Sequence, residues 1–207
     1  MTALLFAWGV LLIGCAGEPL PEPAETTDAV PATENEVSDE TDPPTPIRRT
    51  VSDVDFRDAA LKGDLATAAK AIEEGVNING ADEAKRTALM LSAFYGHHQV
   101  VQTLLDHGAR VHDRDATNRT ALIYAASGRN PEAVELLLDA GADINVADNG
   151  EGWTALMFAA AEGNVEVVRL LLAHGADRTR RDVDGETAEQ FAANNGHLAV
   201  VKLLQGN

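Results

Sequence analysis

Cysteine is almost absent from the 207-residue sequence, which contains only Cys15. A single cysteine excludes a disulfide within the chain, so packing must stabilise the folded part. Long apolar runs are also scarce. No run downstream of residue 15 is long enough to cross a bilayer as a helix.

Basic residues are missing from the first 46 positions, which carry nine acidic residues. The whole chain has 16 basic and 33 acidic residues and a formal net charge of −17. An acidic surface repels a phosphate backbone, and the sequence has no basic stripe to offset that repulsion. We therefore expect no nucleic-acid partner.

The first 13 residues, MTALLFAWGVLLI, are almost entirely apolar. This run is too short for a membrane-spanning helix and is typical of the apolar core of a secretion signal. It leads into Leu12-Ile13-Gly14-Cys15, which resembles the lipobox of bacterial lipoproteins. The resemblance implies a signal peptide over residues 1–14 and a lipidated Cys15 as the mature N-terminus. Acyl chains would anchor the protein, since each buried methylene contributes about 0.8 kcal/mol.

Two details around this motif affect its interpretation. No Lys or Arg precedes the apolar core, so the basic segment usual in such signals is missing. An upstream start or a weak signal would explain this. The alternative to lipidation is an ordinary cleaved signal in which Cys15 has no role. Ala16 follows Cys15 where the family's inner-membrane retention signal is Asp. The resemblance therefore implies the outer membrane of a Gram-negative bacterium, with the protein facing the periplasm.

Residues 15–51 are rich in Pro, Glu and Thr, and seven of the eight prolines lie between residues 19 and 46. Such a segment buries too little apolar surface to offset the entropy lost on ordering, so we expect a disordered acidic linker. Proline and like-charge repulsion would keep it extended, over on the order of 100 Å. This favours a spacer that holds the folded part away from the membrane. The alternative is a proline-rich docking ligand.

Internal repeats account for the remaining sequence. Four segments align as RTALM, RTALI, WTALM and ETAEQ, beginning at Arg86, Arg119, Trp153 and Glu186, and their threonines lie 33, 34 and 33 residues apart. Single glycines, paired leucines and Gly-Ala pairs recur at fixed offsets after them. This pattern resembles the ankyrin repeat over about residues 52–207. It implies an all-α solenoid of about five helix-turn-helix repeats with short β-hairpin fingers. The expected repeats are at about 52–84, 85–117, 118–150, 151–183 and 184–207.

The recurring residues have local roles that support this fold. A threonine hydroxyl can accept the free N–H groups of a first helical turn, so helices are predicted to begin at Thr87, Thr120, Thr154 and Thr187. Glycine adopts positive φ easily and is predicted to end the first helix at Gly96, Gly163 and Gly196. The side chains at one further shared offset are predicted to point into the core, and they belong to Leu91, Tyr124, Phe158 and Phe191.

Some positions depart from the repeat. Gly128-Arg129 stands where the other units have a variable residue followed by glycine, so we expect a different turn there. Glu189 and Gln205 replace apolar residues in the last unit, as expected where a terminal repeat faces water. The array therefore reads as one cap, three internal units and one cap. The finger carboxylates Asp113 and Asp115 are expected to be solvated.

Catalytic motifs are missing from the sequence, which has no HExxH, no Cys/His cluster and no glycine-rich phosphate loop. No serine lies in a nucleophile-elbow context. Histidines near helix ends are more consistent with structural roles than with a metal site, and this applies to His97, His107, His174 and His197. We therefore predict a non-enzyme without cofactor, metal or small-molecule substrate.

In ankyrin arrays, partners contact the finger tips and the exposed positions of the first helices on the concave face. The resemblance places seven residues of this chain there: Arg86, Phe94, Tyr95, Arg119, Trp153, Glu162 and Glu186. Exposed Trp, Tyr and Arg frequently anchor interfaces, and the chain has only nine aromatic residues. The alternative is that Phe94 or Trp153 folds back onto the neighbouring repeat.

These features predict a monomeric, non-catalytic adaptor or scaffold that binds another protein and is held at the cell envelope by lipid on Cys15. Some bacterial periplasmic ankyrin proteins of similar layout support oxidative-stress enzymes such as catalase, so the resemblance implies such a role. An immunity protein that neutralises a secreted toxin in the periplasm is the alternative. A host-directed effector is a third possibility, which lipidation would disfavour.

Overall fold

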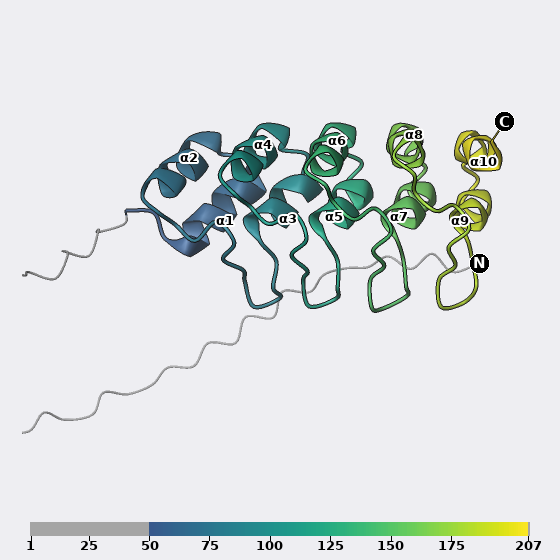
Figure 1. Ribbon diagram of the computed structural model, residues 1–207, viewed down its shortest axis with the longest axis horizontal. Coiled ribbons are helices and arrows are strands. Elements are labelled where there is room, and N and C mark those ends of the chain that lie inside the picture. Colours follow the sequence, from purple (N-terminus) through teal and green to yellow (C-terminus); the bar gives the residue numbers. More distant parts are fainter. Residues whose placement is uncertain (1–49, 207) are drawn as a thin grey trace, which may run out of the picture. The chain divides into compact units, whose positions relative to one another are not determined.

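The repeats form a stack of helix pairs. The computed structural model describes residues 50–206, and this part contains ten helices in five consecutive pairs. The first helices of the pairs form one row, the second helices form another, and the fingers project below the first row (Figure 1). This confirms the predicted all-α solenoid of five repeats. The predicted signal peptide, Cys15 and most of the linker lie outside the described residues.

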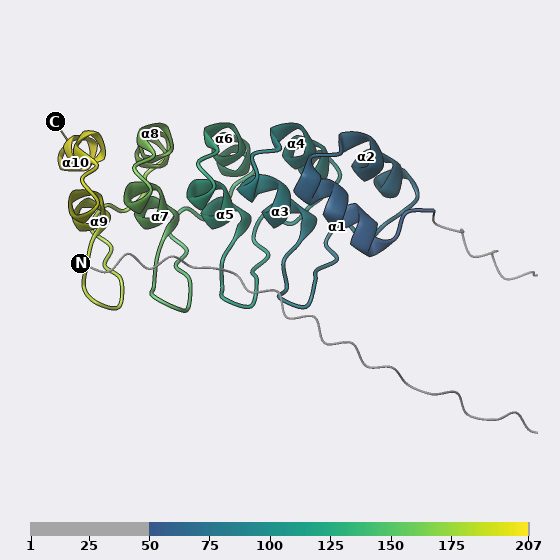
Figure 2. The ribbon, with the colours of Figure 1, turned by 180° about the vertical axis from the view of Figure 1, so that it is seen from behind.

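The two rows keep the same order when seen from behind (Figure 2). The first helices are α1 (Asp53–Lys62), α3 (Ala88–Phe94), α5 (Ala121–Ser127), α7 (Ala155–Ala161) and α9 (Ala188–Asn194). The second helices are α2 (Leu65–Glu73), α4 (His98–Asp106), α6 (Pro131–Asp139), α8 (Val165–Ala173) and α10 (Leu198–Gln205). Within residues 50–206, none of them has both the length and the apolar character that a membrane span requires.

The four repeated threonines stand immediately before α3, α5, α7 and α9, as predicted. The hydroxyls of Thr87, Thr154 and Thr187 each accept the backbone N–H of the third helical residue. Thr120 has the same extended backbone, but its hydroxyl is buried and makes no hydrogen bond. The repeated backbone geometry therefore does not depend on the capping bond in every unit.

The turn after α5 differs from the others, as the sequence predicts. Gly96, Gly163 and Gly196 have φ of +74°, +71° and +78°, whereas Arg129 takes this left-handed position in the third unit with φ +62°. Gly128 precedes it with right-handed geometry, and a Cβ there would collide with the carbonyl oxygen of Phe94. The glycine is displaced by one position because the preceding repeat leaves no room for a side chain.

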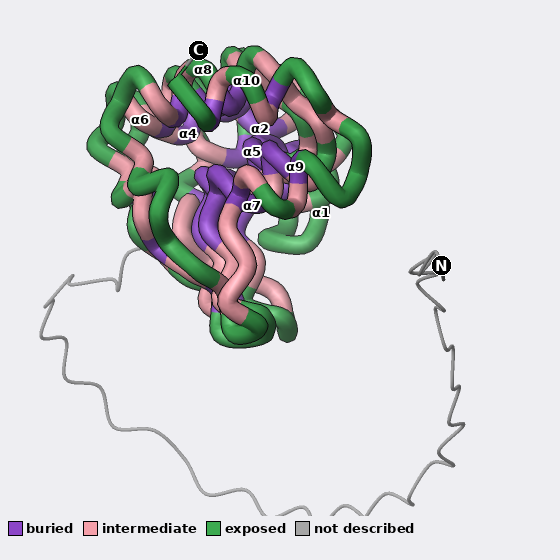
Figure 3. The backbone as a smooth tube through the Cα atoms, turned by 90° about the vertical axis from the view of Figure 1, so that its right-hand side faces the viewer, coloured by how far each residue is buried: buried purple, intermediate pink, exposed green. Residues whose placement is uncertain are grey.

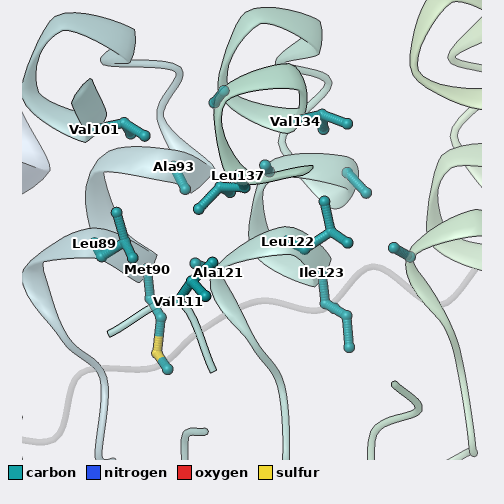
Figure 4. Close-up of a cluster of buried hydrophobic side chains, with 14 of the residues drawn as sticks. Leu89, Met90, Ala93, Val101, Val111, Ala121, Leu122, Ile123, Val134 and Leu137 are labelled. Carbon is teal, nitrogen blue, oxygen red and sulfur yellow. The ribbon is translucent and has the colours of Figure 1, made fainter. Parts of the chain in front are cut away.

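The core lies between the two rows of helices and continues into the upper part of the fingers (Figure 3). Small residues such as Ala125 and Ala126 are fully buried, which lets neighbouring first helices approach closely. Larger side chains such as Leu137 of α6 extend from the second row toward the first (Figure 4). Close packing of this kind fixes the spacing of the repeats.

Each finger is folded around one aspartate at its base. The carboxylates of Asp82, Asp115 and Asp182 each accept the backbone N–H groups of the second and fourth residues after them. Asp115 is only 8% exposed, so the prediction that it is solvated is wrong. The N–H groups that it accepts lie where water does not reach them, so they need an acceptor that is itself buried. Asp113, by contrast, is partly exposed and paired with Arg110 at 2.9 Å.

The finger that follows α6 is one residue longer than the other three. Asp148 accepts the N–H groups of Gly152 and Trp153, the fourth and fifth residues after it. Neighbouring fingers are joined by backbone hydrogen bonds between Ala116 and Ala84, Asn149 and Thr117, and Val183 and Glu151, at 2.9, 3.0 and 2.9 Å. The extra residue is therefore accommodated without loss of the link to either neighbouring finger.

The last helix pair carries the predicted polar substitutions. Gln205 donates its side-chain amide to Glu189 at 2.8 Å, so the two residues that replace apolar ones satisfy each other.

Replacing Asp115 with Ala should lower the free energy of unfolding by about 3 kcal/mol, because several donors lose their acceptor in a buried site. Asp113→Ala removes a partly exposed ion pair from the same finger and should cost less than about 1 kcal/mol. Urea denaturation of the two variants measures the difference. Equal costs would show that burial of the Asp115 carboxylate does not stabilise the finger.

Candidate protein-binding face

The surface made by the fingers and the exposed side of the first helices is called the inner face below (Figure 1). The residue before each capping threonine closes a finger on this face, because its carbonyl accepts the backbone N–H of the finger aspartate. These contacts measure 3.0, 3.0, 2.9 and 3.0 Å at Arg86, Arg119, Trp153 and Glu186. Four predicted binding residues thus occupy equivalent backbone positions that are held by hydrogen bonds.

The Arg86 side chain turns back onto the aspartate of its own finger. Its guanidinium contacts the carboxylate of Asp82 through Nε and Nη2, both at 2.8 Å. Partial burial tends to raise the pKa of Asp82, but the backbone and side-chain hydrogen bonds of Arg86 outweigh it, so that pKa lies below 3.8. The side-chain hydrogen bond with Asp82 also raises the pKa of Arg86. This pair is ionised over the physiological range.

Tyr124 is half-buried and turned toward the fingers. Its hydroxyl donates to Asp115 at 2.8 Å, and its ring meets Phe94 of the preceding repeat edge to face at 6.2 Å between centroids. Burial raises the pKa of the Tyr124 hydroxyl, and the hydrogen bond and negative charge of Asp115 raise it further. The prediction that Tyr124 is a core residue is wrong, because the hydroxyl needs a polar partner, which the finger supplies.

Arg119 connects the second and third fingers and covers an aromatic ring. Its guanidinium binds the buried carboxylate of Asp148 at 3.1 Å and lies 5.1 Å from the centroid of Phe158. Contact of a guanidinium with a ring face is favourable, and more so when water is partly excluded. Phe158 is itself half-buried, so it too belongs to this face rather than to the core.

Trp153 extends the aromatic contacts to the last repeat. Its ring lies 4.9 Å from Phe158 and 4.4 Å from Phe191, measured between centroids. Trp153 and Phe191 are both half-buried against the core. Trp153 therefore folds partly onto the neighbouring repeat, as the alternative interpretation held. Of the four residues expected in the core, only Leu91 is buried, at 7% exposure.

The remaining predicted residues lie at the ends of the first helices or near the last finger. Phe94 and Tyr95 are 38% and 53% exposed, and their rings meet edge to face at 5.0 Å. Glu162 follows the last residue of α7 and pairs with Arg129 at 2.8 Å. Glu186 accepts a hydrogen bond from Asn194 at 3.2 Å.

Together the aromatic residues of this face form what we call the aromatic row, and its members are Phe94, Tyr95, Tyr124, Trp153, Phe158 and Phe191. They belong to four consecutive repeats and include six of the nine aromatic residues in the sequence. Sequence reasoning missed Tyr124, Phe158 and Phe191 as surface residues. A detectable signal was present, since the three large rings share one offset and each is followed by two alanines.

Four of the six histidines bond to backbone carbonyls. Nε2 of His97 lies 3.0 Å from the oxygen of Leu61, and Nε2 of His197 lies 3.1 Å from that of Ala161, each linking a second helix to the repeat before it. His107 and His174 contact carbonyls of their own helices through Nδ1 at 2.8 and 2.9 Å. Within residues 50–206, no three His, Cys, Asp or Glu residues are grouped so that they would hold a metal ion.

Tyr124 can be observed alone in a Tyr95→Phe variant, since the chain has two tyrosines. We expect its tyrosinate absorbance to appear only well above pH 10, the ordinary value. The folded-state pKa is raised, so the stability due to the neutral hydroxyl is complete below pH 10 and is lost as the pH rises toward the folded pKa. An absorbance titration followed alongside circular dichroism measures both effects. A transition near pH 10 in the folded protein would contradict the buried hydrogen bond.

Comparisons with known proteins agree with this geometry. The family described as "Ankyrin repeats (3 copies)" matches residues 56–148 and again residues 146–207. No enzyme family is found, and no curated protein matches the sequence. Ankyrin repeats typically serve as modules for protein–protein interaction and are not catalytic. With five helix pairs, hydrogen-bonded fingers and a family match over most of its length, the chain belongs to the ankyrin-repeat family.

Proposed function

We propose that this protein is a non-catalytic adaptor that binds another protein along its inner face. The observation that carries the proposal is the aromatic row, which crosses four repeats and has arginines beside it. Aromatic and arginine side chains are the commonest anchors of protein interfaces. Because they are already held by neighbours, few rotamers would be lost on binding.

Polar groups on the face support binding rather than proton transfer. The guanidinium groups of Arg86, Arg119 and Arg129 are each paired with a carboxylate, at 2.8, 3.1 and 2.8 Å. Such pairs present fixed charge and remaining N–H donors to a partner. They favour recognition of a surface of defined shape.

The proposal includes attachment to the cell envelope through lipid on Cys15, with the repeats facing the periplasm. Its support is the Leu12-Ile13-Gly14-Cys15 motif and the acidic, proline-rich segment after it. In that setting the adaptor would support an envelope enzyme, such as one that removes oxidants. A single tight partner that is itself a secreted toxin would instead indicate the immunity role.

Partner contact can be tested by placing a photoreactive benzoylphenylalanine at position 95. Tyr95 is 53% exposed on the inner face, so its replacement should not disturb the core. We expect irradiation of intact cells to give one dominant covalent product, detected by gel shift and identified by mass spectrometry. The same residue placed at Leu198, which is 70% exposed in the second row, is the matched control. Identical products at both positions would refute the inner face as the binding surface.

The membrane anchor can be tested separately with a fatty-acid analogue. We expect labelling of the full chain and its loss in Cys15→Ala, because the thiol is the acylated group. Membrane fractionation of both proteins gives the second readout. Equal labelling, or an unchanged membrane fraction, would rule out the lipid anchor while leaving the protein-binding proposal intact.

A further inference from the structure

Two basic residues occupy backbone positions that other repeats fill with glycine. Arg129 has φ +62° where Gly96, Gly163 and Gly196 stand in other units. Lys85 has φ +61° in the first finger, at the position that Asn118 holds with φ +66° in the second and that Gly152 and Gly185 hold in the last two. A non-glycine residue in the left-handed region carries a conformational cost. A cost of this kind is often found at functional sites.

Arg129 lies next to the exposed aromatic pair. Gly128 packs against the carbonyl oxygen of Phe94, and Asn130 donates its side-chain amide to the same oxygen at 2.6 Å. The residues on both sides of Arg129 therefore touch the backbone of Phe94. The Arg129 side chain is 61% exposed and uses one nitrogen for Glu162, so other donors are available to a ligand.

Charge is distributed unevenly along the repeats. Residues 82–129 contain six basic and five acidic residues, whereas residues 130–176 contain one basic and eight acidic residues. The segment from the first finger to the turn after α5 is thus less acidic than the segment that follows it, which runs from α6 to α8. Lys85 is exposed and has no ion pair within residues 50–206. The guanidinium of Arg119 lies over the ring of Phe158, and Arg129 stands between two residues that touch the backbone of Phe94.

We infer that repeats two and three of the inner face bind an acidic, extended segment of the partner protein. Carboxylates of the segment pair with Arg129, Arg119 and Lys85, and an apolar side chain between them packs on Phe94 and Tyr95. The inference rests on the proposed protein-binding function and specifies the chemistry of the partner. The eight acidic residues between positions 130 and 176 repel a second run of carboxylates, which confines the bound segment to the part of the face before them.

A nucleic acid is the other polyanion with suitable chemistry. Its continuous phosphate charge would extend over residues 130–176, which carry eight acidic residues and one basic residue. A short acidic peptide meets only the basic part of the face. The peptide is therefore the favoured ligand.

The test uses the full chain and a display library of random peptides. Selected peptides should be enriched in Asp and Glu, and their affinity should fall as salt rises. The decisive variant is Arg129→Gly, which removes the charge and restores the residue that suits a left-handed turn. We expect it to unfold at a temperature no lower than the parent and to bind the selected peptides about tenfold more weakly, as loss of one charged contact implies.

Arg169→Gln is the matched control, because it removes an exposed positive charge from α8 in the second row. Its peptide affinity should equal that of the parent. Selection of neutral or basic peptides, or unchanged affinity in Arg129→Gly, would overturn the inference while leaving protein binding in place. Enrichment of no peptide, together with no covalent product at position 95, would count against the proposed function itself. Tighter binding of a single-stranded oligonucleotide than of any acidic peptide would also overturn the inference.

Discussion

The carboxylate at the base of each finger is the contact on which the inner face depends. In every finger it accepts two backbone N–H groups, and the second belongs to the residue that projects onto the face. In the two central fingers the aspartate is also buried. One carboxylate therefore positions Arg86, another Arg119, a third Trp153 and a fourth Glu186. The helices set the spacing of the repeats, but these hydrogen bonds fix the orientation of the side chains that a partner would meet.

The same backbone framework presents different chemistry in each repeat. The position before the repeated threonine holds Arg, Arg, Trp and Glu in successive repeats. The position four residues after the threonine holds Leu, Tyr, Phe and Phe. Side chains at these positions contact the next repeat. Arg119, for example, binds Asp148 and lies over the ring of Phe158. The face is consequently a connected surface whose character changes along the stack, from basic and exposed near Tyr95 to aromatic and half-buried near Trp153.

Helix starts and ends could be predicted from the sequence because they are decided locally, by a threonine hydroxyl or a glycine with positive φ. The displaced turn at Gly128 was also predictable, since the repeat itself shows the exchange. The extent to which Tyr124, Phe158 and Asp115 are buried could not be predicted. Helical periodicity indicates that an offset faces inward, but it does not tell a core position from one under the fingers. That distinction depends on a neighbouring repeat, through contacts such as Tyr124 with Asp115 or Phe158 with Arg119.

The longer third finger shows how such a surface can diversify. Its additional residue shifts the acceptor pattern of Asp148 by one position, yet the bonds to the fingers on both sides remain. An additional residue at a finger tip can thus be accommodated without a change in the contacts between helices. A change in the length of one finger therefore alters the surface that it presents, while the hydrogen bonds to the neighbouring fingers stay in place.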